Sequence, residues 1–254
     1  MRDAYVTARG DSYPLYSRRA PFAQRDERIS VRHAIAALLL CAAAPAFAQT
    51  DTDSQIWLTA SASTKISDTI DLSLETVLRF GSDADGLYEG EYGGDLGFAI
   101  GDGMKLSAGY VRVPQYSRAG VTAIEDRARQ AISFGVGEFA GGTLSARIRI
   151  EERWRNTGSD TGFRLRPKLT WVRPFTPEGK TALVISHESL IELNDADWGQ
   201  SAGYDRMRNF IGIATPLVEG VKIEGGYLNQ WGLKRDGDPA SVDHALSMSL
   251  AYSF

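Results

Sequence analysis

Side chains that alternate between apolar and charged are the feature that most constrains the fold of this chain. In one segment the apolar positions are Leu144, Ala146, Ile148 and Ile150, and the positions between and after them are Ser145, Arg147, Arg149 and Glu151. Successive side chains of a β-strand point to opposite faces of the sheet, so a repeat of two predicts a strand with one apolar and one ionic face. This repeat returns from residue 55 to the C-terminus, and helical spacing is nowhere sustained. We therefore expect an all-β fold.

The length of the alternating segments favours strands that cross a membrane. A tilted strand needs ~9–11 residues to cross a bilayer, whereas strands of soluble proteins usually have ~5–6. The expected strands reach the longer class, and they occupy residues 55–66, 70–80, 92–100, 104–113, 127–137, 143–154, 163–173, 181–193, 204–215, 221–231 and 242–254. A soluble periplasmic β protein is the alternative fold.

The expected connections also alternate in length. Short turns are expected at residues 67–69, 101–103, 138–142, 174–180 and 216–220, and longer polar links at residues 81–91, 114–126, 155–162, 194–203 and 232–241. Outer-membrane barrels have short periplasmic turns and longer external loops. The pattern thus predicts a closed antiparallel up-and-down transmembrane β-barrel. Bacterial barrels usually have an even strand number, so we expect about 12 strands (range 10–12), with a short additional strand within residues 49–54.

Charged residues on the non-apolar face of these strands are expected to line the lumen. An arginine facing lipid at the bilayer midplane costs ~2–4 kcal/mol, so the charges must point inward. The expected lumen residues are Glu75, Arg79, Arg127, Arg129, Arg147, Arg149, Glu151, Arg153, Arg164, Arg166, Glu188, Arg206, Arg208 and Glu224. Two interpretations use the same residues: an ion-pair lattice that fills a narrow structural barrel of the envelope, or a small water-filled pore that favours anionic solutes.

The N-terminal region is expected to be removed during export. Arg28 and Arg32 precede an apolar stretch at residues 34–44, and Ala46 and Ala48 are the small residues that signal peptidase requires before Gln49. Residues 28–48 are thus predicted to be a signal peptide, and 49–254 the mature barrel. Residues 1–27 are polar, and we interpret them as a disordered extension that a misassigned translation start has added.

The last strand carries a predicted assembly signal. Leu250, Tyr252 and the terminal Phe254 lie on one face of that strand. This pattern is similar to the signal that the bacterial barrel-assembly machinery reads, so that machinery and the lipid of the outer membrane are the expected partners. Other aromatic residues near strand ends are expected to form interfacial girdles, namely Trp57, Trp154, Trp171, Trp231, Tyr110 and Tyr227.

Several spaced motifs resemble a known family. They are Glu151-Glu152-Arg153, Arg164-Leu165-Arg166-Pro167, Glu188, Arg206-Met207-Arg208-Asn209 with Gly212, and Gly226-Tyr227-Leu228-Asn229-Gln230. With them the chain resembles domain-of-unknown-function family 2490, predicted outer-membrane β-barrels of Gram-negative bacteria, over nearly all of its mature length. The resemblance implies fold and location but no activity. The chain departs from the family pattern after Glu188, where Ser189 and Leu190 replace the usual aromatic residue.

An enzymatic alternative rests on His187, Ser189 and Asn209. All three are expected on the lipid-facing side of adjacent strands. A His-x-Ser pair on the barrel exterior is similar to that of outer-membrane phospholipase A and the lipid A deacylase, in which the histidine deprotonates the serine for attack on an acyl ester. Leu190 and Ile191 stand where those enzymes have Asn-Gly. Both interpretations, hydrolase and non-enzyme, stay open.

Other classes of function find little support in the composition. Without residues 1–48 the chain keeps 21 basic and 28 acidic residues, which disfavours nucleic-acid binding. The single cysteine, Cys41, lies in the predicted signal peptide, and only two histidines remain in the mature chain, so neither a metal site nor a cofactor is expected. The sequence specifies neither a solute nor an oligomeric state.

Overall fold

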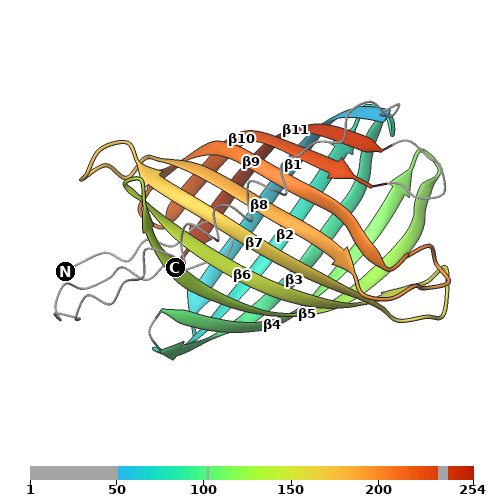
Figure 1. The fold of residues 1–254 in the computed structure, drawn as a ribbon, viewed down its shortest axis with the longest axis horizontal. Coiled ribbons are helices and arrows are strands. Elements are labelled where there is room, and N and C mark those ends of the chain that lie inside the picture. Colours follow the sequence, from blue (N-terminus) through green and yellow to red (C-terminus); the bar gives the residue numbers. More distant parts are fainter. Residues whose placement is uncertain (1–50, 102, 234–239) are drawn as a thin grey trace.

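The computed structural model describes residues 51–101, 103–233 and 240–254, which form one closed barrel (Figure 1). Its eleven strands are β1 (Asp51–Lys65), β2 (Ile70–Gly81), β3 (Gly86–Gly101), β4 (Met104–Ser117), β5 (Gly120–Phe139), β6 (Gly142–Arg155), β7 (Gly162–Pro174), β8 (Ala182–Glu192), β9 (Gly203–Val218), β10 (Val221–Gly232) and β11 (Ser241–Ser253). No helix among the described residues is long and apolar enough to cross a membrane. The predicted extension, the signal peptide and its cleavage site at Ala46, Ala48 and Gln49 lie outside the described residues.

A parallel pair of strands closes the barrel. Every strand pairs antiparallel with its neighbour in sequence, but β1 pairs with β11 in parallel, from Asp51 opposite Ser241 to Ser63 opposite Ser253. The expectation of a twelfth strand was wrong, because Asp51 to Ser54 continue β1 in the same register along β11. With an odd strand number, the first and last strands must run in the same direction.

The connections at the two ends of the barrel differ in length, although less than expected. We call the end at which β6, β8 and β10 finish the loop end, and the opposite end the turn end. Two of the longer links were predicted wrongly, since the strands extend into tight connections at residues 82–85 and 118–119. The connection at residues 175–181 is the longest at the turn end. β1 enters the sheet at the loop end, and β11 finishes at the turn end (Figure 1).

The outer surface of the sheet is apolar and the inner surface is polar. In β6, Ile148 and Ile150 are 45% and 39% exposed, whereas Arg147 and Glu151 on the other face are 9% and 1% exposed. Other strongly exposed apolar residues come from strands around the whole barrel, and they include Leu74, Leu96, Leu106, Ile185, Ile213 and Leu246. The fold class predicted from the repeat of two, an all-β closed barrel, is confirmed.

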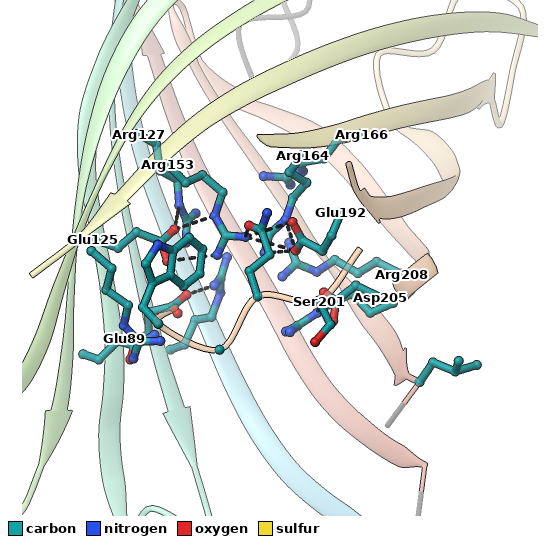
Figure 2. Close-up of a pocket in the computed structure, with 18 residues that line it drawn as sticks. Glu89, Glu125, Arg127, Arg153, Arg164, Arg166, Glu192, Ser201, Asp205 and Arg208 are labelled. Atoms are coloured by element: carbon teal, nitrogen blue, oxygen red, sulfur yellow. Dashed lines mark hydrogen bonds and ion pairs between the residues drawn. The ribbon is translucent and has the colours of Figure 1, made fainter. Parts of the chain in front are cut away.

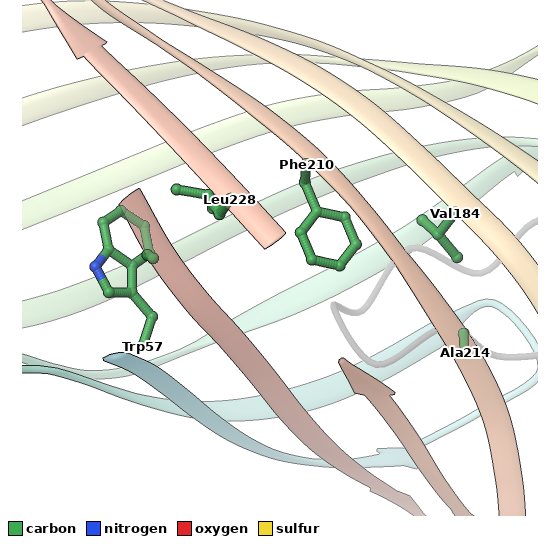
Figure 3. Close-up of a cluster of buried hydrophobic side chains, with 6 residues drawn as sticks. Trp57, Val184, Phe210, Ala214 and Leu228 are labelled. Atoms are coloured by element: carbon green, nitrogen blue, oxygen red, sulfur yellow. The ribbon is translucent and has the colours of Figure 1, made fainter. Parts of the chain in front are cut away.

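One sector of the interior is packed with apolar side chains. Trp57, Val184, Phe210, Ala214, Leu228 and Ala245 form a buried cluster (Figure 3). They belong to β1 and to β8–β11. Trp57 was expected in an interfacial girdle, but it is 5% exposed and packs in this cluster, because it has the same orientation as the inward-facing Arg79, its partner in β2. The lumen is therefore narrowed by an apolar sector on one side.

Candidate functional site

A continuous network of buried ion pairs runs around the lumen from β2 to β9. Carboxylates are its nodes, and each of them bridges at least two arginines. Followed from one ion pair to the next, the network is Arg79, Glu91, Arg127, Glu125, Arg153, Glu192, Arg164, Glu151, Arg166, Glu188 and Arg208. Each strand from β2 to β9, apart from β4, contributes at least one member. We call this set the ionic ring.

Glu151 and Glu188 are the most heavily shared nodes of the ionic ring. Glu151 lies 2.7 Å from Arg166, 3.7 Å from Arg164 and 3.8 Å from Arg149. Glu188 lies 2.9 Å from Arg166 and 2.7 Å from Arg147, and Arg208 is more distant at 3.8 Å. A buried ion pair is tolerated only when its partners and hydrogen bonds compensate for the lost hydration. Sharing each carboxylate among several arginines provides that compensation.

Trp57 completes the ionic ring across the apolar sector. The guanidinium carbon of Arg79 lies 4.2 Å from the centroid of the Trp57 ring, and that of Arg208 lies 4.8 Å from it. These distances are within the range of cation–π interactions. The first and last arginines of the ring thus meet on one indole, so charged and aromatic side chains encircle the interior.

A cavity of about 400 Å³ opens within the ionic ring toward the loop end. Figure 2 shows ionic side chains crowding into it from several strands. Its arginines outnumber its carboxylates: the former are Arg79, Arg127, Arg153, Arg155, Arg164, Arg166, Arg206 and Arg208, and the latter are Glu89, Glu125, Glu192 and Asp205. We call this cavity the vestibule. Its excess of cations makes it suited to an anionic solute.

A second, smaller cavity of about 80 Å³ adjoins the vestibule. Arg79, Arg166 and Arg208 line both cavities and form the wall between them. Within the described residues, some buried guanidinium N–H groups of the two cavities have no hydrogen-bond partner: Nε of Arg79, Arg147, Arg149, Arg155 and Arg166. An unpaired buried donor is costly, so these N–H groups favour occupation of the cavities by water or an anion.

The connection between β8 and β9 folds over the vestibule. Trp198 is buried beneath the Arg153 guanidinium, 5.0 Å from ring centroid to guanidinium carbon, and Gln200 accepts a hydrogen bond of 2.8 Å from Arg153. Asp197 joins this connection to the one between β6 and β7, because its carboxylate accepts hydrogen bonds from the backbone N–H groups of Ser159 and Asp160. These bonds hold the pKa of Asp197 below its usual value. The loop-end mouth therefore has an ordered cover.

All the charged residues predicted to line the lumen lie on the inner face. Most belong to the ionic ring or contact it; Arg129 pairs with Asp95 and Glu75, and Glu224 lies apart near the turn end. Sequence reasoning missed several acidic partners, among them Glu89, Glu91, Glu125 and Glu192; the first three were placed in loops and the last at a strand end. Glu125 stands two positions before Arg127, so a longer extension of the repeat of two would have found it.

The outer face of β8 and β9 carries a hydrogen-bonded chain of polar side chains. Nδ1 of His187 lies 2.7 Å from Oδ1 of Asn209, and Nε2 of the same ring lies 3.1 Å from Oγ of Ser189. The hydroxyl of Tyr204, which the sequence did not single out, lies 3.0 Å from that Oγ. The structure therefore brings the three predicted residues together and adds a fourth.

The predicted assembly residues also lie on the outer face. Leu250, Tyr252 and Phe254 are exposed, and the rings of Tyr252 and Phe254 stack with their centroids 5.3 Å apart. Their recognition by the assembly machinery stays a prediction. Within the described residues, no group of three or more His, Cys, Asp or Glu side chains is arranged to hold a metal ion.

The fold and the ionic lumen define a class of protein, a closed β-barrel with an apolar exterior. Residues 54–240 match the family described as protein of unknown function (DUF2490), and the chain belongs to this family. An uncharacterized protein of Methylorubrum extorquens is 38% identical over 156 residues, which cover 61% of this chain and 68% of the relative. Among solved structures, the siderophore receptor PirA from Pseudomonas aeruginosa matches with a TM-score of 0.27 and 14% identity over 68% of this chain. The match spans 33% of that receptor.

Proposed function

We propose that this chain is an integral barrel of the bacterial outer membrane that admits small anionic solutes into its lumen. Membrane insertion is supported by the exposed apolar side chains that surround the barrel, since a soluble protein rarely exposes so large a contiguous apolar surface. The backbone also suits lipid, because in a closed sheet every strand has two neighbours with which to pair its polar groups.

The observation that carries the anionic preference is the wall between the two cavities. Arg79, Arg166 and Arg208 stand there together, so a solute that moves from the vestibule inward must pass three guanidinium groups. Rings of positively charged side chains select anions in other pores. The second cavity, lined by Trp57 and only about 80 Å³ in volume, favours small species such as inorganic anions.

Planar lipid bilayers test this proposal. The purified barrel, in a gradient of potassium chloride, is expected to give channels of small conductance. The sign of their reversal potential is expected to show that chloride permeates better than potassium. Arg208→Gln removes one charge from the wall and is expected to reduce the selectivity. Arg118→Gln is the matched control, because Arg118 lies in an exposed connection and its side chain is 79% accessible.

Two results would overturn the proposal. Cation selectivity of the unaltered barrel would contradict the role of the arginine wall. Complete absence of conductance from a barrel that shows heat-modifiable migration would instead support the second candidate, a structural envelope barrel sealed by the ionic ring; the burial of Glu151, at 1% exposure, is the observation that favours this candidate. Recovery of the processed protein as a freely water-soluble species would exclude both.

A further inference from the structure

We propose that the outer face of β8 and β9 hydrolyses acyl esters of membrane lipids, with Ser189 as nucleophile and His187 as general base. This activity is separate from the lumen, because the two residues point away from it. The observation that carries the proposal is the order of the hydrogen bonds that link Asn209, His187 and Ser189.

The hydrogen bonds give the histidine the tautomer that catalysis needs. Oδ1 of Asn209 can only accept, so Nδ1 of His187, 2.7 Å away, carries the proton. Nε2 then presents its lone pair to Oγ of Ser189 at 3.1 Å, a distance suited to proton transfer. A nucleophile, a base and a group that orients the base are the recurring arrangement of serine hydrolases on unrelated folds.

The site lies where an acyl chain can reach it. Ile185 and Ile211, the outward-facing neighbours on the turn-end side, are 40% and 48% exposed. His187 in β8 pairs with Asn209 in β9, Asn209 pairs with Asn229 in β10, and Asn229 pairs with His244 in β11. These four residues form one row of outward polar side chains. Polar side chains on the outer face are cheap only near the membrane interface, so this row indicates the depth at which lipid ester groups lie.

The sheet is irregular around Ser189. On one side, the pairing between β7 and β8 is interrupted at Arg166 and Pro167, and proline has no N–H for a ladder hydrogen bond. On the other side, the pairing of β8 and β9 shifts between Leu190 and Ile191. Such irregularities re-aim side chains and are common beside active sites. Here the shift brings the Tyr204 hydroxyl to 3.0 Å from Oγ of Ser189.

The reaction that follows from this geometry is an acyl transfer to water. Nε2 of His187 accepts the proton of Ser189 as Oγ bonds to the ester carbonyl carbon, and the Tyr204 hydroxyl donates to the developing oxyanion. The bond from the carbonyl carbon to the alcohol oxygen then breaks, and His187 returns the proton to the departing lyso-lipid. His187 then deprotonates a water molecule, which attacks the carbonyl carbon of the acyl-serine. The bond from that carbon to Oγ breaks, His187 returns the proton to Oγ of Ser189, and the fatty acid leaves. Asn209 acts as a positioning residue.

Fatty-acid release by the full-length processed barrel tests the proposal. Mixed detergent micelles of phosphatidylethanolamine, and separately of lipid A, provide the two possible sources of the acyl ester, and a diether analogue of the phospholipid provides the uncleavable control. Release from at least one ester and none from the diether is expected. Ser189→Ala and His187→Ala are each expected to lose about 100-fold or more of the rate. A fluorophosphonate probe is expected to label Ser189.

Matched variants separate chemistry from folding. His244→Ala removes the other described histidine, which lies on the same outer face and bonds to Tyr227, and it is expected to leave the rate unchanged. Asn209→Ala is expected to lower the rate and to change its pH profile, and Asn209→Asp to restore both, because a carboxylate can hold the same tautomer. Each variant must first show heat-modifiable migration.

The proposal fails if the folded, unaltered barrel releases no fatty acid from either lipid and takes up no probe. It fails equally if release continues in Ser189→Ala, and the polar row then only marks the membrane interface. Arg208→Gln is expected to keep full hydrolysis, so loss of the anion pathway and loss of this activity are distinguishable.

Discussion

Replacement of Glu151 by glutamine tests how the ionic ring contributes to stability. Glu151 is 1% exposed and faces three arginines. Two of them keep another carboxylate: Arg166 has Glu188 at 2.9 Å and Arg164 has Glu192 at 2.6 Å. Arg149 keeps none, because its pair with Glu151 is the only ion pair that it makes within the described strands. The substitution thus leaves one buried cation without a counter-charge.

The expected loss follows from that single uncompensated charge. Breaking a buried ion pair by removing one partner costs about 3–5 kcal/mol, and the long Arg149–Glu151 distance of 3.8 Å points to the lower end, about 3 kcal/mol. Urea unfolding of the barrel in lipid vesicles, followed by tryptophan fluorescence, measures the change. The double variant Glu151→Gln with Arg149→Gln removes the stranded charge and is expected to recover most of the loss.

Arg118→Ala provides the comparison, since the side chains of Arg118 and its partner Asp85 are both exposed. This ion pair is expected to contribute less than about 1 kcal/mol to the free energy of unfolding. A stability of Glu151→Gln within about 0.5 kcal/mol of the unaltered barrel, the scatter of ordinary surface substitutions, would refute the reasoning. So would a double variant less stable than Glu151→Gln, because the loss would then come from packing and not from charge.

Three further predictions address the packing of adjacent strands, the cover of the vestibule and the C-terminus. In Gly226→Ala the new methyl group would collide with the backbone of Ile211 and Gly212, whereas in Gly225→Ala it meets nothing within 4 Å; the first is expected to lose about 1–3 kcal/mol more in the same unfolding assay. Because its pKa is lowered, the Asp197 carboxylate stabilises the cover fully above the unfolded-state pKa of ~3.9, and this stabilisation is lost as the pH falls through the folded-state pKa. The protection of the Ser159 amide from hydrogen exchange should therefore decrease over this pH range in the unaltered protein. In Asp197→Ala the same pH change should have no such effect. Phe254→Ala is expected to lower the heat-modifiable fraction in outer membranes severalfold, and unchanged assembly would contradict the predicted signal.

The repeat of two was sufficient to predict the barrel, because a one-residue shift would turn every apolar side chain of a strand to the wrong face. It also predicted which faces of β5–β9 hold charge, as for Arg147 and Arg164. It failed where the pattern has no contrast. Residues 86–91 are Gly-Leu-Tyr-Glu-Gly-Glu, which suggested a loop, yet they form the start of β3 and supply Glu91 to the ionic ring.

Strand number and the role of Trp57 could not be predicted for a different reason. Both depend on how distant segments meet. Closure of the sheet by β1 along β11 is a contact between the two ends of the barrel sequence, and no local pattern encodes its parallel direction. Trp57 has the alternation of a lumen residue, but its cation–π partners, Arg79 and Arg208, belong to the separate strands β2 and β9.

Because β1 and β11 are parallel, the two ends of the barrel sequence lie at opposite ends of the barrel. The sheet begins with Asp51 at the loop end and finishes with Ser253 at the turn end. Peptide epitopes placed just before Asp51 and just after Phe254 should therefore be read by antibodies from opposite sides of the membrane.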